Sequence, residues 1–301
     1  MGSVRGNETN LSLRKKERCS RDLSTRQSMP ELPEVETIRK SLEKELKNRT
    51  IVDVIVNYEN IIAEPTVFSF VEQIKNQTIH QLKRYGKWLI FELDQYVLLS
   101  HLRMEGKYFF RTKEDPISKH EHVIFCLDDD RELRYHDTRK FGRMYLLKKE
   151  EAYDVPPLSK LGLEPWDSLL TVTYLKEKLK NKTIPIKTCL LDQSIIVGIG
   201  NIYANEILFL SRISPLKKSN CLTKKELERI IENTRTVLKE AIEMGGSTIR
   251  SYHPSEGIDG MFQQKLYVHG KDGIPCPVCG KPIQKKFING RSSYYCAHCQ
   301  K

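Results

Sequence analysis

The sequence has no long hydrophobic run, and its first residues lack the apolar segment of a secretory signal peptide. It also lacks the cysteine distribution of a disulfide-stabilised secreted protein. Four of its eight cysteines are scattered, and the other four form two CxxC pairs near the end of the chain. Paired cysteines of this kind indicate one metal site in a reducing compartment. We therefore expect a cytoplasmic protein with no membrane partner.

Acidic residues are too few to balance the basic ones. The formal net charge is +11 and the isoelectric point is about 9.1, which favours a polyanionic partner, nucleic acid first. Residues 1–28 carry seven basic and three acidic residues, a net +4, so the remaining chain keeps +11 − 4 = +7. These 28 residues are polar and lack hydrophobic periodicity. We expect a disordered extension, or an artefact of an upstream start codon.

Residues 29–37, MPELPEVET, combine two prolines with three glutamates. The simplest interpretation is a helix start, with Pro33 as the first helical residue and glutamates near the positive end of the helix dipole. A second interpretation concerns Pro30. If translation starts at Met29 and that residue is removed, Pro30 is a secondary amine with Glu31 beside it. An α-amine with a pKa of about 7.7–8.0 is a nucleophile at neutral pH.

Residues 29–150 form the first expected domain. From residue 50 to 147, short apolar runs rich in β-branched and aromatic residues alternate with turn residues. The clearest runs are 51–56, 88–93, 96–99 and a hairpin over 123–135. Helical patterns occur only at the front and near 67–74, so we expect a β-sandwich or barrel.

Two turns of this domain carry apolar or basic tips. HLRMEG over 101–106 contains Met104, and DTRKFG over 137–142 contains Arg139 and Phe141. An isolated turn of this kind usually folds one side chain into the core, but rigid loops with such tips also serve as wedges between DNA base steps. Lys87, in RYGKWL at the entry of a strand, is by itself an ordinary exposed lysine.

The second half of the chain is expected to be helical. Residues 151–170, which contain several prolines, indicate a linker, and residues 171–270 indicate a helical domain. In this domain VGIGNIYANE over 197–206 is a glycine-rich turn that opens a helix, where free backbone amides suit a phosphate. Thr223 starts a capping box for a long amphipathic helix that ends at Gly245. The polar residues 245–270 favour a mobile loop.

The strongest single signal lies in residues 271–301. Two CxxC pairs with sixteen residues between them match the spacing of a tetrahedral four-cysteine zinc site. The cysteines are Cys276, Cys279, Cys296 and Cys299. About thirty residues build no core unaided, so we expect one structural Zn2+ to hold this ribbon together. Arg291 lies at the tip of a basic hairpin between the pairs.

Taken in order, these motifs closely resemble the formamidopyrimidine-DNA glycosylase family over residues 29–301. The motifs are PELPEVE, RYGKWL, HLRMEG, KHEH, DTRKFG, GIGNIYANE, GGSTIR and the cysteine ribbon. The resemblance implies an α+β multidomain fold: an N-terminal β-sandwich, a helix-two-turn-helix domain and a C-terminal zinc finger. It also implies a bifunctional DNA glycosylase and AP lyase of base excision repair, which removes oxidised purines through a Schiff base and nicks the strand by β,δ-elimination.

The resemblance assigns roles to the matching residues. Pro30 is the expected nucleophile, Glu31 the acid that assists sugar-ring opening, and Lys87 the residue of β-elimination. Arg291 would serve δ-elimination or hold the adjacent phosphate. The other expected site residues are His120, Arg139, Lys182 and Asn201 for phosphates, Met104, Arg139 and Phe141 for the void left by the extruded base, and Glu34, Ser247, Thr248 and Arg250 for the base pocket.

The implied partner is double-stranded DNA with an oxidised base or an abasic site, bound by a monomer in the bacterial cytosol without a catalytic cofactor. One departure from the family concerns residues 1–28. With them attached, Pro30 is a tertiary amide and has no nucleophilic lone pair. We therefore expect the functional chain to start at Met29, or the extension to be cleaved.

Two alternatives stay open. An enzyme resembling endonuclease VIII has the same fold and chemistry but removes oxidised pyrimidines; the PELPEVE start and the residues 139–141 favour the purine-directed branch. A non-catalytic protein that binds damaged DNA, with Pro30 blocked, is the other alternative. In such a protein the presence of Pro30, Glu31 and Lys87 would have no chemical explanation.

Overall fold

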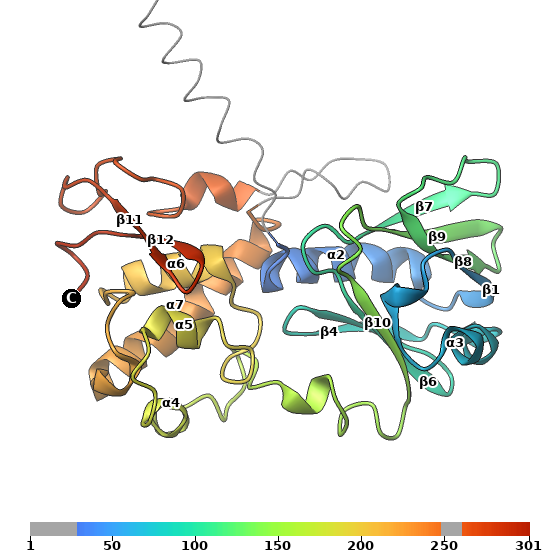
Figure 1. Ribbon diagram of the computed structural model, residues 1–301, viewed down its shortest axis with the longest axis horizontal. Coiled ribbons are helices and arrows are strands. Elements are labelled where there is room, and N and C mark those ends of the chain that lie inside the picture. The colour runs from blue at the N-terminus through green and yellow to red at the C-terminus, as the bar shows by residue number, and fades with distance from the viewer. Residues whose placement is uncertain (1–28, 248–260) are drawn as a thin grey trace, which may run out of the picture.

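The computed structural model describes residues 29–247 and 261–301. The expectations for residues 1–28, Thr248 and Arg250 lie outside the described residues. Within these ranges the chain forms two lobes that lie side by side and are joined by residues 149–171 (Figure 1). No helix in the two ranges is long and apolar enough to cross a membrane.

The first lobe contains two α-helices, a short 3-10 helix and ten strands within the described residues. They are α2 (Leu32–Leu46), β1 (Thr50–Val56), η1 (Glu59–Ile61), β2 (Ile62–Glu64), α3 (Val67–Ile74), β3 (Gln77–Thr78), β4 (Gln81–Tyr85), β5 (Trp88–Glu92), β6 (Tyr96–His101), β7 (Lys107–Thr112), β8 (Glu121–Leu127), β9 (Arg131–His136) and β10 (Arg143–Lys148).

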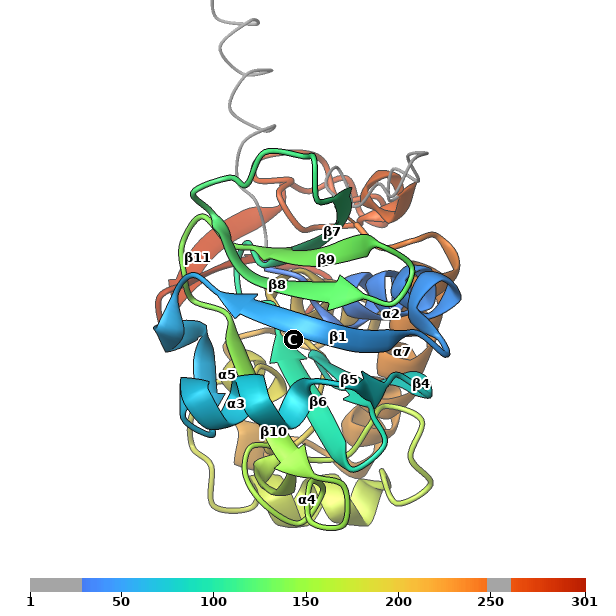
Figure 2. The ribbon, with the colours of Figure 1, turned by 90° about the vertical axis from the view of Figure 1, so that its right-hand side faces the viewer.

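These strands form two five-stranded sheets. Sheet A has the order β3-β1-β8-β9-β7, and sheet B the order β2-β10-β6-β5-β4. Figure 2 looks onto this lobe and shows β8 and β9 in one layer and β5 and β6 in the other. One apolar core takes side chains from both sheets and from α2. The predicted β-sandwich is therefore confirmed.

Helix α2 connects this core to the second lobe. Its buried residues Val35, Ile38 and Leu42 recur at helical spacing and face the sandwich core. Burying one such side chain contributes about 1.5–3 kcal/mol. The helix begins at Leu32, one residue before the predicted start at Pro33, because the first turn tolerates a proline at either position.

The second lobe is mainly helical and ends in a β-hairpin. Its elements are η2 (Leu158–Lys160), α4 (Val172–Leu179), α5 (Ile186–Leu190), α6 (Asn201–Leu210), η3 (Ser219–Cys221), α7 (Lys224–Glu243), η4 (Met261–Lys265), β11 (Gln284–Ile288) and β12 (Arg291–Tyr295). The apolar faces of α4 to α7 pack into a second core, which also takes Leu32 from the start of α2.

The helix-capping residues in the sequence predicted the start of α7 correctly. The Thr223 hydroxyl accepts from the Glu226 amide, and the Glu226 carboxylate accepts from the Thr223 amide, so the predicted capping box is confirmed. One prediction is wrong. The segment from Met261 onward is not a loose loop, because η4 packs Phe262 into the second core. Within the predicted linker, residues 151–170, Leu158 packs against sheet B.

Candidate active site and nucleic-acid interface

The side chain of Glu31 joins the start of α2 to the start of α6. Its carboxylate accepts hydrogen bonds from the backbone amides of Gly200 (2.7 Å), Ile202 (2.8 Å) and Tyr203 (3.3 Å). These amides have no partner inside their own helix, so the carboxylate caps α6. A Cβ atom at Gly200 would lie 2.3 Å from the Glu31 carboxyl carbon, which explains the glycine. The prediction that these amides await a phosphate is wrong, since Glu31 occupies them.

Glu31 is only 2% exposed. The pKa of its carboxyl group is raised to about 7: burial is the main cause and the neighbouring Glu34 adds to it, while the charge of Lys87 and the amides of Ile202 and Tyr203 oppose the rise. An acid with this pKa is partly protonated at neutral pH. It can therefore give a proton to a reacting group under physiological conditions.

Lys87 lies at the entry of β5, beside this carboxylate. It is 6% exposed, so the expectation of an ordinary exposed lysine is wrong. Burial lowers the pKa of its amine, the charges of Glu31 and Glu34 oppose this, and the charge of Arg291 lowers the pKa further. A lysine with a lowered pKa can act as a base near neutral pH.

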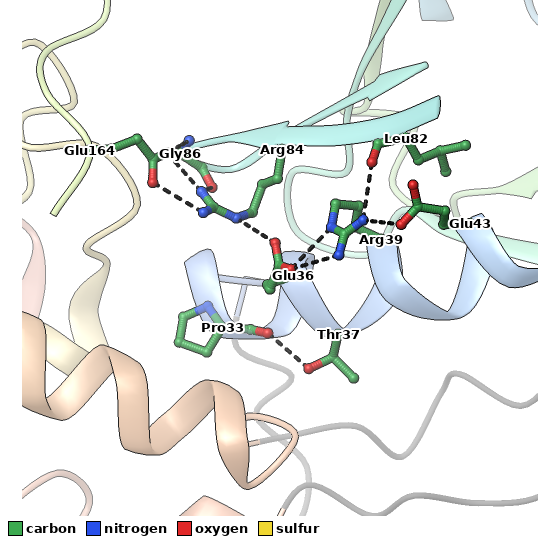
Figure 3. A network of polar contacts seen from close by, with 9 residues as sticks. All are labelled: Pro33, Glu36, Thr37, Arg39, Glu43, Leu82, Arg84, Gly86 and Glu164. Carbon is green, nitrogen blue, oxygen red and sulfur yellow. Dashed lines mark hydrogen bonds and ion pairs between the residues drawn. The ribbon is translucent and has the colours of Figure 1, made fainter. Parts of the chain in front are cut away.

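A polar network fixes the turn that precedes Lys87 (Figure 3). The guanidinium of Arg84 donates to both carboxylate oxygens of Glu164, at 2.7 and 3.0 Å, and to Glu36 of α2 at 2.9 Å. The amide of Gly86 donates to the same Glu164 at 2.6 Å. Glu164 of the segment between the lobes and Glu36 of α2 thus both hold the β4–β5 turn in place.

Glu34 links the first turn of α2 to the expected base pocket. It is 3% exposed and accepts hydrogen bonds from the Tyr203 hydroxyl at 2.7 Å, the Ser247 amide at 2.8 Å and the Ser247 hydroxyl at 3.0 Å. The structure therefore brings together Glu34 and Ser247, two of the predicted pocket residues. Gly246 has φ +86°, and a Cβ there would crowd the Glu34 carboxylate.

The two predicted wedge turns (residues 101–106 and 137–142) lie at the same end of sheet A (Figure 1). The carboxylate of Asp137 shapes the second one by accepting from the amides of Arg139 (3.0 Å), Phe141 (2.9 Å) and Gly142 (2.8 Å). Phe141 is 48% exposed, with the Arg139 guanidinium 4.7 Å from its ring centroid. Its ring does not fold into the core. Met104 is half-buried on the first turn.

The expected phosphate ligands differ in their surroundings. His120 has a buried Nδ1 without a hydrogen-bond partner among the described residues, and the same holds for the side-chain oxygen of Asn201. Lys182 pairs with Asp192 at 3.5 Å. These residues and Arg139 belong to both lobes, so a duplex that contacts them all would have to bridge the lobes.

The four ribbon cysteines lie together. Their Sγ atoms are all within 4.8 Å of one another, and Cys276 and Cys296 are buried. Four converging sulfur ligands of this kind fit a tetrahedral zinc ion. The thiolates would hold it between the knuckles of the ribbon, where its role is structural because no ligand position is left open.

Hydrogen bonds attach the ribbon to the helical lobe. The buried carboxylate of Glu206 on α6 accepts from the amides of residues 267–269, at 2.6–3.1 Å. The buried Lys187 amine donates to the Ser292 carbonyl at 2.8 Å and to the Ser293 hydroxyl at 2.7 Å, next to Arg291. Burial lowers the pKa of Lys187 to about 7.

Sequence reasoning missed Glu164, Lys187 and Glu206 as residues that position the site. Their partners are between 61 and 106 residues away in the chain, so no local motif marked them.

Comparisons with known proteins cover all three parts of the chain. Three family models match: the formamidopyrimidine-DNA glycosylase N-terminal domain over residues 29–144, the formamidopyrimidine-DNA glycosylase H2TH domain over 161–253, and the zinc finger found in FPG and IleRS over 273–301. A formamidopyrimidine-DNA glycosylase of Bacillus cereus (strain ATCC 10987) is 48% identical over 273 residues, which are 90% of this chain and 99% of the relative.

Two solved structures of the Lactococcus lactis FPG protein are similar. A mutant of that protein in complex with Fapy-dG-containing DNA has a TM-score of 0.84 and 37% identity, covering 90% of this chain and all of that one. The wild-type protein in complex with DNA containing an oxidised pyrimidine has a TM-score of 0.83 and 36% identity, with the same coverage.

Proposed function

The chain belongs to the formamidopyrimidine-DNA glycosylase family and is a DNA glycosylase of base excision repair, and we propose that it removes oxidised purines by nucleophilic attack of Pro30. The observation that carries the proposal is the position of Glu31. This buried acid, with a pKa of about 7, directly follows the proline and lies beside the buried Lys87. Nucleophile, acid and base are thus within one small region at the start of α2.

The chemistry requires the damaged nucleotide to leave the base stack, because the glycosidic carbon is inaccessible inside a duplex. Side chains of the wedge turns would fill the vacated space, and phosphate contacts on both lobes would offset part of the cost of extrusion. The Pro30 amine would then attack C1′ of the sugar. Glu31 would donate a proton to the ring oxygen, so that the sugar opens and the base leaves.

The product of this attack is an iminium ion. Because Pro30 is a secondary amine, the iminium nitrogen carries no N–H proton, so the ion cannot lose its positive charge by deprotonation at nitrogen. The positive charge makes the 2′ proton acidic. Lys87 would accept that proton in β-elimination, which breaks the bond to the 3′ phosphate. Arg291 at the ribbon tip would support the second elimination, which breaks the bond to the 5′ phosphate.

The nucleophile requires a free amine at Pro30. We propose that the active chain begins at this residue, after loss of residues 1–28 and of Met29. The matched N-terminal family model begins at residue 29, and the B. cereus relative matches over 273 residues, the length of the segment from 29 to 301 (301 − 28 = 273). Since the paired thiols require a reducing compartment, we also propose the bacterial cytosol as its location.

Oxidised purines are the first substrate class, and oxidised pyrimidines are the second candidate. The PELPEVE start and the residues 139–141 support the purine class. A related protein has been crystallised with DNA containing an oxidised pyrimidine, which supports binding of the second class as well. Excision of 8-oxoguanine opposite cytosine, compared with excision of thymine glycol, ranks the two classes; faster release of thymine glycol contradicts the first choice.

Borohydride trapping tests the nucleophile. A chain that begins at Pro30, mixed with a duplex bearing one 8-oxoguanine, is expected to form a covalent adduct at the N-terminal residue, identified by peptide mass. The 301-residue chain is the matched control and is expected to form none. An adduct at an internal lysine, or an equal yield from the 301-residue chain with its extension intact, would overturn the assignment of Pro30.

A further inference from the structure

A row of polar side chains crosses the end of sheet A beside the wedge turns. His136, the last residue of β9, is the direct cross-strand partner of Lys107 on β7 and of Glu121 on β8. Directly paired residues of an antiparallel ladder point to the same face of the sheet, so these three side chains are neighbours. His120, just before β8, adds a second imidazole, whose ring centroid is 5.5 Å from that of His136.

The position of this row is set by the chain. Lys107 directly follows the first wedge turn, and His136 directly precedes the second. The row therefore lies at the base of both turns, on the end of sheet A where the duplex would be wedged open (Figure 1). A phosphate held here would belong to the DNA backbone beside the extruded nucleotide.

Neither imidazole makes a hydrogen bond within the described residues, although the His136 ring packs edge-on against Phe109. The Nδ1 atoms of His120 and His136 are buried, and neither finds a partner in the described part of the chain. An N–H group without an acceptor is costly to bury, so each ring favours the tautomer with the lone pair on Nδ1 and the proton on Nε2. The Nε2–H group is then the donor that remains for a ligand.

Electrostatic surroundings keep the His136 ring neutral. Burial lowers its pKa first, followed by the charges of His120 and Lys107; Glu121 opposes this, and His122 adds to it. A neutral ring donates through Nε2–H without taking up a proton.

The row offers positive charge and donors to a ligand. Lys107 is half-buried and forms no ion pair within residues 29–247 and 261–301. The carboxylate of Glu121 is already occupied by the Arg134 guanidinium at 3.1 Å and by the Ser118 amide at 2.9 Å. One free ammonium and two imidazole N–H groups are complementary to a phosphate diester.

We propose that His136 and Lys107 complete, together with His120, a binding site for one phosphate of the DNA backbone at the base of the wedge turns. The proposal rests on the function proposed above. It adds two residues to His120, the histidine for which the family resemblance implies a phosphate contact. Both imidazoles donate to phosphate oxygens, and Lys107 supplies the charge.

Substitutions at His136 separate hydrogen bonding from packing. The amide nitrogen of glutamine can reach the place of Nε2, whereas that of asparagine reaches only the place of Nδ1. His136→Asn is expected to weaken binding to a duplex with an abasic-site analogue about tenfold, the effect of losing one hydrogen bond to a charged group, and His136→Gln to restore most of it. His80→Asn, at an exposed histidine paired with Asp94, is the control and is expected to leave binding unchanged.

The charge of Lys107 has a separate signature. For Lys107→Met, the slope of log K against log salt concentration is expected to decrease by about 0.9, because one phosphate neutralisation is lost. His136→Asn is expected to keep the wild-type slope. Melting temperatures of all variants show whether the sandwich has folded, and if His136→Asn does not fold, the Lys107→Met slope decides.

The outcomes are distinguishable. A wild-type chain that neither binds the duplex nor is trapped by borohydride contradicts the proposed function. A wild-type chain that binds, together with a His136→Asn variant of equal affinity or an unchanged slope for Lys107→Met, overturns the phosphate site. Equal losses for His136→Asn and His136→Gln would make His136 a packing residue and also overturn it.

Discussion

The two ends of the candidate site are held by different forces. Around Pro30, the buried Glu31 carboxylate accepts from amides at the start of α6, and burial shifts the pKa values of Glu31 and Lys87 toward neutrality. Around Arg291, an exposed hairpin tip is held by the four-cysteine site and by hydrogen bonds to Lys187 and Thr188 of α5. In the proposed mechanism, proton transfer would depend on exclusion of water at the first end, and the contact of Arg291 with DNA would depend on a metal at the second.

Glu31→Gln is expected to have the largest effect, which is the loss of proton donation at the Pro30 end of the site. Loss of the proton donor is expected to slow base release by about 10²–10⁴-fold, the usual contribution of a general acid. Trapping on a preformed abasic site, whose sugar ring opens spontaneously, should lose much less. Single-turnover rates on the two substrates measure this difference, and equal losses would contradict the role of Glu31 as the acid for ring opening.

Removal of zinc is expected to unfold the ribbon around Arg291 and to leave the β-sandwich around Pro30 folded. With a chelator, or in Cys279→Ser, the ribbon is expected to unfold, and duplex affinity to decrease at least about tenfold through the loss of Arg291 and its neighbours. The apolar sandwich should keep its melting transition. Calorimetry together with a binding titration checks both; simultaneous melting of both lobes would show that the two ends are not independent.

Substitution of Glu164 tests whether the buried end depends on the segment between the lobes. Glu164→Gln keeps one acceptor but loses the charge paired with Arg84, so the turn carrying Lys87 loses part of its support. We expect β-elimination to slow by about tenfold and base release by less, since a bond to a charged group is worth about 1.5 kcal/mol. Product gels that resolve base release from strand cleavage measure the ratio.

The pH dependence of base release is expected to distinguish the two ends with the smallest effect. For the proposed role of Glu31 as proton donor, kcat/KM for base release is expected to fall as pH rises above about 7, the raised pKa of its carboxyl group. The deprotonated Pro30 amine gives the opposite limb, with a rise toward about pH 8. Arg291→Ala should keep this bell-shaped profile, because Arg291 is not among the groups that shift the pKa of Glu31; a wild-type profile without the alkaline limb would contradict the role of Glu31 as the acid.

Local patterns in the sequence were sufficient for part of this arrangement. The cysteine spacing, the Thr223 capping box and the α3 segment 67–74 were predicted as the structure has them, since each depends on residues within one element. Strands β7 and β10 were not singled out, because their short apolar runs have charged ends and adjoin wedge turns.

Local sequence patterns could not predict the burial and the hydrogen-bond partners of the site residues. Lys87 is buried near Glu31 and Glu34, more than 50 residues earlier in the chain, and the amides that donate to Glu31 come from residues about 170 positions later. Contacts between distant parts of the chain therefore determine both the burial of Lys87 and the hydrogen-bond acceptor of the glycine-rich turn, which is Glu31. The roles of the site residues remain predictions, now with specific geometry.

The bonds from Glu31 to the start of α6 have a consequence for turnover. When Glu31 gives up its proton, its carboxylate becomes fully charged while it still faces the three amides, and hydrogen bonds to a charged acceptor are the stronger kind. Proton donation therefore tightens the joint between the lobes at the moment when the base is lost. The covalent intermediate would therefore be held between the lobes more firmly than the intact substrate, which would keep it in place until the eliminations that cut the strand.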